Sequence, residues 1–176
     1  NTSAFTISAW IYPNIVIRSN FQGIVSKRVG LNNQQSYSLF INTEGLLTAD
    51  IDSNNDRFSY SNALVPNQWT HVALTFDGSL TSAERAKLYV DGALVKVSSE
   101  TSASIPDYES SLTIGSILGN PIFFNGTIDE VAIWNVSLTS DKISEHAGAK
   151  VLDYSNYKNN GTRNFNSTSD NGKNFT

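Results

Sequence analysis

The segment that decides the fold is AFTISAWIYP, residues 4–13. From Phe5 to Ile11 an apolar side chain occupies every second position, and Pro13 ends the run. Successive side chains of an extended strand point to opposite faces, so this spacing is typical of a strand that buries one face. The segment therefore predicts a β-strand of a layered β-structure.

Similar short runs, separated by turn residues, continue along the chain. They are GIVSKRV (23–29), SYSLFIN (36–42), GLLTADI (45–51), RFSYSNAL (57–64), QWTHVALTF (68–76), KLYVDGALVKV (87–97), SLTIG (111–115) and GTIDEVAIWN (126–135). Asp91-Gly92 predicts a tight hairpin turn, because both residues tolerate positive φ. LTSDKISEHA predicts a helix, with Thr139 or Ser140 as N-cap and Gly148 beyond its end. We expect an all-β antiparallel two-sheet sandwich with one short helix near residues 139–147.

Composition narrows the classes of protein. The 176 residues carry a formal net charge of −4, so there is no basic surface to suggest a nucleic-acid partner. Cysteine is absent, which excludes disulfides and thiolate chemistry. No apolar run approaches the ~20 residues that cross a bilayer, so we expect no membrane insertion.

Only 16% of the residues are charged, and a polar, uncharged surface favours an extracellular or cell-surface location. Because the chain opens on Asn1, we expect a processed or excised piece of a longer protein.

Asn-x-Ser/Thr sequons are compatible with a glycosylated exterior protein. Their number is little more than this Asn-, Ser- and Thr-rich composition predicts by chance. The candidate glycosylation sites are Asn1, Asn125, Asn135, Asn160, Asn166 and Asn174.

Four stretches, in order and in register, carry a family resemblance. They are FTISAWIYP, NQWTHVALTFDG, KLYVDGALV and FNGTIDEVAIWNVSLTSDKI. Together they resemble the laminin-G-like, concanavalin A-like jelly-roll domain over residues 5 to about 147. The resemblance implies two stacked antiparallel sheets, in agreement with the strand pattern.

The opening segment of that family is displaced in this chain. Its counterpart is EHAGAKVLDYSNYKNNGT, residues 145–162, near the C-terminus. The matching positions are Glu145, Gly148, Val151, Asp153, Ser155, Asn156, Asn159, Gly161 and Thr162. We therefore divide the chain into a jelly roll, 1–150, and a strand-forming tail, 151–176. A sandwich without its first strands has an unpaired edge. The tail could complete its own sandwich, complete a neighbouring copy by strand complementation, or leave the edge open.

Calcium is the one cofactor that the sequence suggests. Alternation along TIDEVAIW places Asp129 on the face of Val131 and Ile133. Both faces of this run carry apolar residues, so either could be the inward one; if the Val131 and Ile133 face is core, a carboxylate at its edge needs hydrogen bonds or a metal. The family resemblance implies a structural Ca²⁺ held by Asp129, Glu145 and the carbonyl of Gly148. The alternative is an Asp129 that is held by hydrogen bonds alone.

Two other motifs favour structural interpretations. DIDSNND, residues 50–56, has the alternating oxygen ligands of a calcium loop, but Asn55 and Ser61 stand where glycine and glutamate are needed. A polar hairpin turn is therefore the better interpretation of residues 50–56.

The histidines and acidic residues do not form a recognisable catalytic motif. His71 has no nucleophile or carboxylate in a recognisable motif, and His146 has no partner at metal-ligand spacing. Asp129 and Glu130 are adjacent and point opposite ways, so they are no glycosidase pair, and we expect no enzyme.

The function that we expect is structural. We predict a non-catalytic extracellular structural or adhesive module, one unit of a tandem array or filament whose partners are copies of itself or adjacent domains. The alternative is a carbohydrate-binding, lectin-like module of a larger secreted protein. Aromatic side chains available to hold a glycan are Trp10, Tyr12, Phe58, Tyr60, Tyr108 and Trp134.

Overall fold

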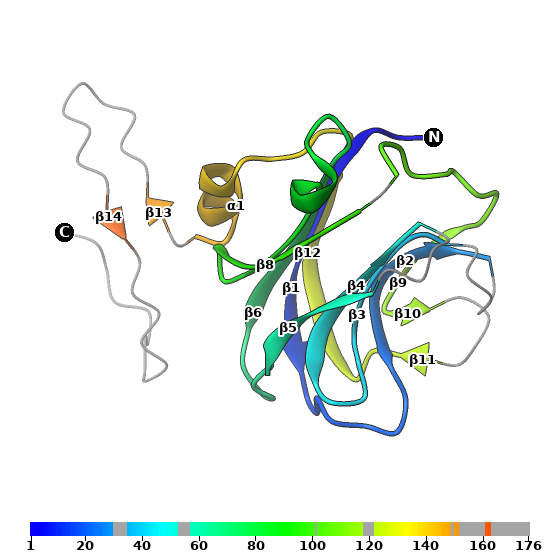
Figure 1. Ribbon diagram of the computed structural model, residues 1–176. Helices are drawn as coiled ribbons and strands as arrows, with labels where there is room; N and C mark the ends of the chain where they lie inside the picture. The colour runs from blue at the N-terminus through cyan, green and yellow to red at the C-terminus, as the bar shows by residue number, and fades with distance from the viewer. Residues whose placement is uncertain are drawn as a thin grey trace.

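The fold is a two-sheet β-sandwich with one helix on its outside (Figure 1). The computed structural model describes residues 1–29, 35–52, 57–100, 102–117, 122–148, 150–151 and 161–162. Sheet A has the strand order β12-β1-β6-β7-β8, and sheet B has the order β5-β4-β3-β2-β9. All their pairings are antiparallel, so the predicted fold class is confirmed.

The bounds of the elements follow the sequence runs closely. Sheet A contains β1 (Ala4–Pro13), β6 (Thr70–Asp77), β7 (Ala86–Val90), β8 (Ala93–Ser98) and β12 (Gly126–Trp134). Sheet B contains β2 (Gln22–Arg28), β3 (Gln35–Ile41), β4 (Leu46–Ile51), β5 (Phe58–Ala63) and β9 (Leu112–Ile114). The remaining elements are the 3₁₀ turn η1 (Ser82–Glu84), β10 (Ser116–Ile117), β11 (Ile122–Phe123), α1 (Ser140–His146), β13 (Lys150–Val151) and β14 (Gly161–Thr162).

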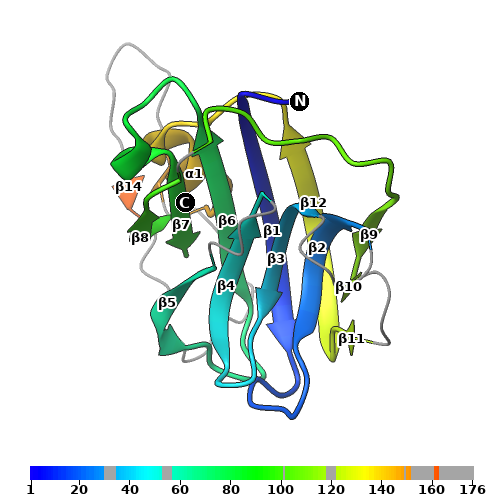
Figure 2. The same cartoon turned by 45° about the vertical axis from the view of Figure 1, so that its right-hand side comes forward.

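The two sheets face each other in Figure 2, and the hydrophobic core lies between them. β1 contributes the alternating apolar side chains of its sequence, from Phe5 to Ile11, all at most 3% exposed. Leu39 of β3 and Leu74 of β6 are fully buried in the same core. Each phenylalanine, isoleucine or leucine of this set contributes roughly 1.5–3 kcal/mol by leaving water, so these facing rows hold the sandwich together.

Local signals for the hairpin and the helix are confirmed. Asp91 and Gly92 have φ angles of 48° and 78°, as the tight turn between β7 and β8 requires. Thr139 caps α1, since its hydroxyl accepts a hydrogen bond from the Lys142 amide at 3.4 Å. Ile143 packs α1 onto the outer face of sheet A, against Ala73 and Tyr89. No helix among the described residues is long and apolar enough to span a membrane.

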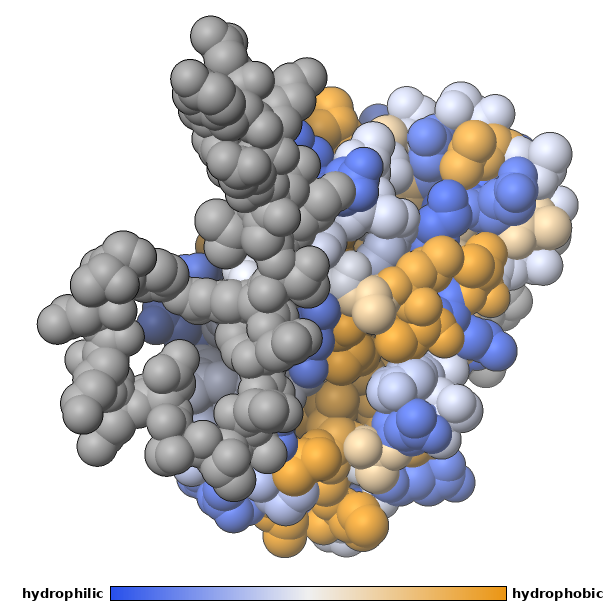
Figure 3. Space-filling model, turned by 90° about the vertical axis from the view of Figure 1, so that its left-hand side faces the viewer, coloured by the Kyte–Doolittle hydropathy of each residue, from blue (hydrophilic) through white to orange (hydrophobic). Residues whose placement is uncertain are grey.

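On two sides of the sandwich, strand edges have no further pairing strand among the described residues. On one side, β9 and β12 expose aliphatic side chains: Leu112 is 43% exposed, Ile114 55% and Ile133 42%. On the other side, where β8 and β5 approach each other, Figure 3 shows a band of apolar surface. Leu94 and Val97 of β8 are exposed there. In the described part of the chain, no strand pairs with the outer edge of β9 or β12.

The described residues of the tail join neither large sheet. β13 and β14 pair with each other, Lys150 opposite Thr162 and Val151 opposite Gly161. Residues 152–160 and 163–176 lie outside the described residues. Whether residues 151–176 complete this sandwich or another copy therefore stays a hypothesis.

Candidate functional site

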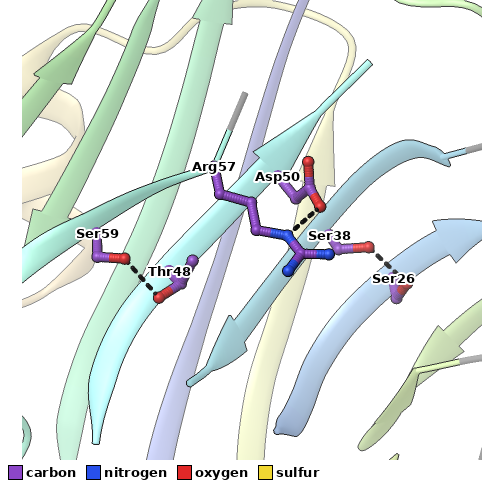
Figure 4. Close-up of polar contacts among 6 residues, drawn as sticks. All are labelled: Ser26, Ser38, Thr48, Asp50, Arg57 and Ser59. Carbon is purple, nitrogen blue, oxygen red and sulfur yellow. Dashed lines mark hydrogen bonds and ion pairs between the residues drawn. The ribbon is translucent and has the colours of Figure 1, made fainter. Parts of the chain in front are cut away.

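The outer face of sheet B is polar but largely buried. In β2, β3 and β4 the apolar side chains face the core, so the alternate positions carry Ser26, Ser38, Thr48 and Asp50, all at most 3% exposed. The Ser26 and Ser38 hydroxyl oxygens lie 2.8 Å apart, and Thr48 is equally close to Ser59 of β5 (Figure 4). Buried polar groups of this kind must be hydrogen-bonded, so they form a fixed row across the sheet.

A small hairpin covers part of this face. β10 and β11 pair, with Ser116 opposite Phe123, and Ile117 and Ile122 pack on Phe40 and Phe21. The close approach depends on Gly23, because any Cβ there would collide with the backbone of Ser116 and Ile117. A glycine in β2 therefore positions the apolar wall of the site.

Arg57 extends over the polar row, and its position is fixed from two sides. Its Nε donates to Oδ2 of Asp50 at 2.9 Å, and Figure 4 shows this contact. Arg57 is the residue just before β5, and Asp50 belongs to β4. Its guanidinium carbon lies 5.5 Å from the ring centroid of Phe21 and 6.0 Å from that of Phe40. These distances are within the range of cation–π contacts. Asp50 is fully buried, whereas the Arg57 side chain is 37% exposed.

Arg28, at the end of β2, is the second cation of this face. It is 3% exposed. Burial lowers the pKa of its guanidinium, the carboxylate of Asp50 raises it, and the like charge of Arg57 lowers it. Two guanidinium groups thus interact with the same buried carboxylate.

These groups line a cavity of about 300 Å³ on the outer face of sheet B. Its lining comprises Ser19, Asn20, Phe21, Arg28, Thr43, Arg57, Ile117 and Ile122. The set combines an aromatic ring, an aliphatic wall, hydroxyl and amide groups, and two cations. Such a set can hold a small polar ligand by ring contact and hydrogen bonds. No carboxylate occurs in this lining as described, so the paired acids of a glycosidase are not found there.

The candidate calcium ligands lie in different settings. Asp129 is exposed on β12, and its Oδ1 accepts a hydrogen bond from the Glu130 amide at 2.8 Å. Glu145 of α1 forms an ion pair with Lys142 at 2.7 Å. Gly148 follows the helix with φ 63°. No group of three or more acidic or histidine side chains suited to a metal ion occurs among the described residues. The calcium site, which also needs the Gly148 carbonyl, stays a prediction.

A β-bulge corrects the predicted face of Asp129. Ser8 pairs with Ala132 and Trp10 with Asp129, so one residue of β1 opposes two of β12. Glu130, inside the bulge, has φ 47°. Val131 consequently packs against the core without Asp129, and Ile133 is exposed. The simple alternation was wrong here because one extra residue reverses the faces.

His71 occupies a second cavity, of about 300 Å³, on the outer face of sheet A. It is 1% exposed, and its ring lies 5.5 Å from that of Trp10. His146 of α1 and Glu130 line the same cavity. Among the described residues Nδ1 of His71 has no hydrogen-bond partner. Burial, and then the charge of His146, lower the pKa of His71 to about 4. The burial agrees with a structural role for His71, but the unpartnered Nδ1 does not agree with a histidine whose hydrogen bonds are all satisfied.

The other predicted positions are spread over the molecule. Asn1, Asn125 and Asn135 are exposed, and Asn160, Asn166 and Asn174 lie outside the described residues; glycosylation stays a prediction.

β4 and β5 form the hairpin predicted around the acidic loop, of which 53–56 is not described. Its Asp50 and Asp52 are buried, Asp52 accepting from the Ser102 hydroxyl.

The aromatic residues singled out for glycan binding do not gather at the sheet B cavity. Phe58 is in the core and Tyr60 packs against it, whereas Trp10 and Trp134 line the cavity of His71. The sequence interpretation missed Phe21, Arg28 and Arg57. A usable signal of a polar outer face was present in three successive strands. Hydroxyl or charged side chains stand at alternate positions of SKR (26–28), SYS (36–38) and LTAD (47–50).

The family model of the concanavalin A-like lectin/glucanases superfamily, laminin G type, matches residues 1–144. The chain belongs to this family. No curated protein sequence matches it significantly. The match includes every strand of both large sheets, so the predicted laminin-G-like resemblance is confirmed.

Solved structures of the same fold include carbohydrate-binding proteins. A proposed carbohydrate-binding protein from Bacteroides ovatus is 22% identical with a TM-score of 0.66, over 81% of this chain and 40% of that one. The Ruminococcus gnavus IT-sialidase CBM40, solved with α2,3-sialyllactose, is 17% identical with a TM-score of 0.66, over 82% and 83%. Trypanosoma rangeli sialidase is 19% identical with a TM-score of 0.62, over 82% and 22%. This chain thus spans less than half of the first and about a fifth of the third, and these likenesses concern the fold.

Proposed function

We propose that this chain is a non-catalytic carbohydrate-binding module that binds glycans in the cavity on the outer face of sheet B. The observation that carries the proposal is the lining of that cavity: Phe21 contributes an aromatic ring, and Asn20 and Thr43 contribute hydrogen-bonding groups. Sugars present both C–H faces and hydroxyl groups, so they match this combination. The lectin superfamily and the carbohydrate-binding neighbours support this function more than a filament role. An extracellular location is part of the same proposal.

The first test is a glycan array probed with the labelled chain. We expect the chain to retain a defined subset of glycans. Phe21→Ala should weaken that binding tenfold or more, about 1.4 kcal/mol, because it removes the ring face and the surface on which Arg57 rests. Trp69→Ala is the matched control, since Trp69 is a 43% exposed aromatic outside this cavity. An array without any retained glycan, or equal loss in both variants, contradicts the proposal.

Strand complementation remains a second candidate function, favoured by one observation. Leu112 and Ile114 on β9 and Ile133 on β12 expose apolar side chains beside sheet edges that no described strand pairs with. Such edges are templates for another strand. We infer that residues 151–176 of a neighbouring copy are the occupant.

Deleting residues 151–176 tests this second function. We expect the full chain to form concentration-dependent oligomers in light scattering, and the deleted chain to stay monomeric or lose solubility. Ile133→Lys should block association by placing a charge at the edge, whereas Leu94→Lys on β8 should not. A monomeric full chain whose melting is unchanged by the deletion excludes complementation.

A further inference from the structure

Positive charge is concentrated in the sheet B cavity although the protein is acidic. Arg28 and Arg57 line it, and the described lining contains no acidic side chain. Asp50 lies behind Arg57 and is fully buried. Among the described residues at this cavity, two guanidinium groups face one carboxylate, in a chain whose net charge is −4. An excess charge in a half-buried cavity favours an anionic ligand.

In the described part of the chain, the terminal nitrogens of Arg57 donate no hydrogen bond. Its Nε is bound to Asp50, and the rings of Phe21 and Phe40 hold the guanidinium plane. Within the described residues, Nε is the only Arg57 nitrogen that donates a hydrogen bond. In Figure 4 the guanidinium reaches from Arg57 across β4 toward Ser38. A guanidinium fixed in this way can bind a carboxylate through two parallel N–H groups.

The environment of Arg28 points the same way. The guanidinium is buried, and both burial and the like charge of Arg57 lower its pKa. An anion beside the two guanidinium groups would oppose the effect of Arg57 on Arg28. Ile117 and Ile122 line the same cavity with apolar surface, which lowers the local dielectric and favours this attraction.

We propose that the cavity selects sugars that carry a carboxylate, with Arg57 binding the carboxylate through its terminal nitrogens and Arg28 adding its charge. This inference rests on the proposed glycan-binding function and names its substrate class. Phe21, Asn20 and Thr43 then contact the sugar ring and its hydroxyl groups. Nonulosonic and uronic acids both supply the required group, and the two are separated by experiment.

The test is isothermal titration calorimetry of the whole chain with two matched pairs of ligands. α2,3-Sialyllactose is compared with lactose, and methyl β-glucuronide with methyl β-glucoside. We expect at least one acidic member to bind roughly ten- to hundredfold more tightly than its neutral partner, the size expected for charge-assisted hydrogen bonds. Whether the sialic acid or the glucuronide binds identifies the class of acidic sugar that supplies the carboxylate. Raising the salt concentration should weaken the binding of the acidic ligand and leave the binding of the neutral ligand unchanged.

Variants of Arg57 decide whether this residue is responsible. Arg57→Gln should abolish the preference for the acid. Arg57→Lys keeps a charge beside Asp50, and hence the fold, but lacks the planar pair of donors, so it should lose most of the preference. Lys96→Gln removes the same charge from the exposed edge of sheet A and should change nothing. Circular-dichroism melting verifies that each variant is folded.

The outcomes separate the inference from the proposed function. Equal binding of acidic and neutral ligands, or an unchanged preference in Arg57→Gln, overturns the inference. If neutral glycans bind and Phe21→Ala abolishes their binding, glycan binding stands and the selection of acids fails. If no glycan of either kind binds, both fail.

Discussion

Replacing Asp50 with alanine is expected to lower the free energy of unfolding by about 3–5 kcal/mol. Asp50 is fully buried, pairs with Arg57 and is the carboxylate whose charge opposes that of the buried Arg28. Removing it leaves the Arg28 charge buried without that compensation, which costs more than the ion pair itself contributes. For a chain of this size the melting temperature should fall by about 6–20 °C, measured by calorimetry.

Two further variants test the cause of this loss. Asp107→Ala removes the partner of Lys27 in an exposed ion pair, so its melting temperature should barely change. The double replacement Asp50→Leu with Arg28→Met should recover much of the lost stability, because apolar side chains can replace the two buried charges, while the remaining Arg57 side chain is 37% exposed and stays solvated. If Asp50→Ala is as harmless as Asp107→Ala, Asp50 does not organise this face.

Acid should destabilise the protein through His71. Its folded pKa of about 4 lies below the value of about 6.5 expected when unfolded, so the unfolded state binds the proton more readily. The sign follows directly: the contribution is fully present above pH 6.5 and is lost as the pH falls to about 4. A difference of about 2.5 pKa units corresponds to about 3 kcal/mol.

The measurement is urea unfolding from pH 7.5 to pH 4, with the wild type compared with His71→Gln. Burial raises the pKa of Asp91, whose carboxylate accepts from the His71 amide, and this acts in the opposite sense. Asp91 and the other carboxylates are common to both proteins, so the difference isolates His71. His146→Gln should retain most of the pH dependence, because burial is the larger cause of the shift. Parallel pH profiles for the wild type and His71→Gln would exclude the assignment.

Most of the sandwich could be predicted because its signals are local. Period-two alternation identified β1 and its core face, Asp91-Gly92 identified the β7–β8 turn, and the choice of Thr139 or Ser140 as N-cap located the start of α1. Alternation failed at Glu130, because a bulge depends on the pairing of β12 with β1. A neighbouring strand, rather than the local sequence, sets such a shift.

The site itself was largely hidden in the sequence. Phe21 precedes β2, Arg57 precedes β5, and Ile117 and Ile122 come from a hairpin much later in the chain. Their types are unremarkable in isolation, and no fixed spacing links them. They form one cavity because the sheet order places β2, β3, β4 and β5 side by side, and because Gly23 admits the hairpin.

The sequence alone thus determined the sandwich, the core face of β1, the helix and the family. The tertiary structure decided which polar side chains converge, because strand order and close backbone approach bring together residues far apart in the chain. It replaced six scattered aromatic candidates by one cavity with Phe21, Arg28 and Arg57. Periodicity records which face of a strand is buried, whereas a binding site depends on contacts between elements that periodicity does not encode.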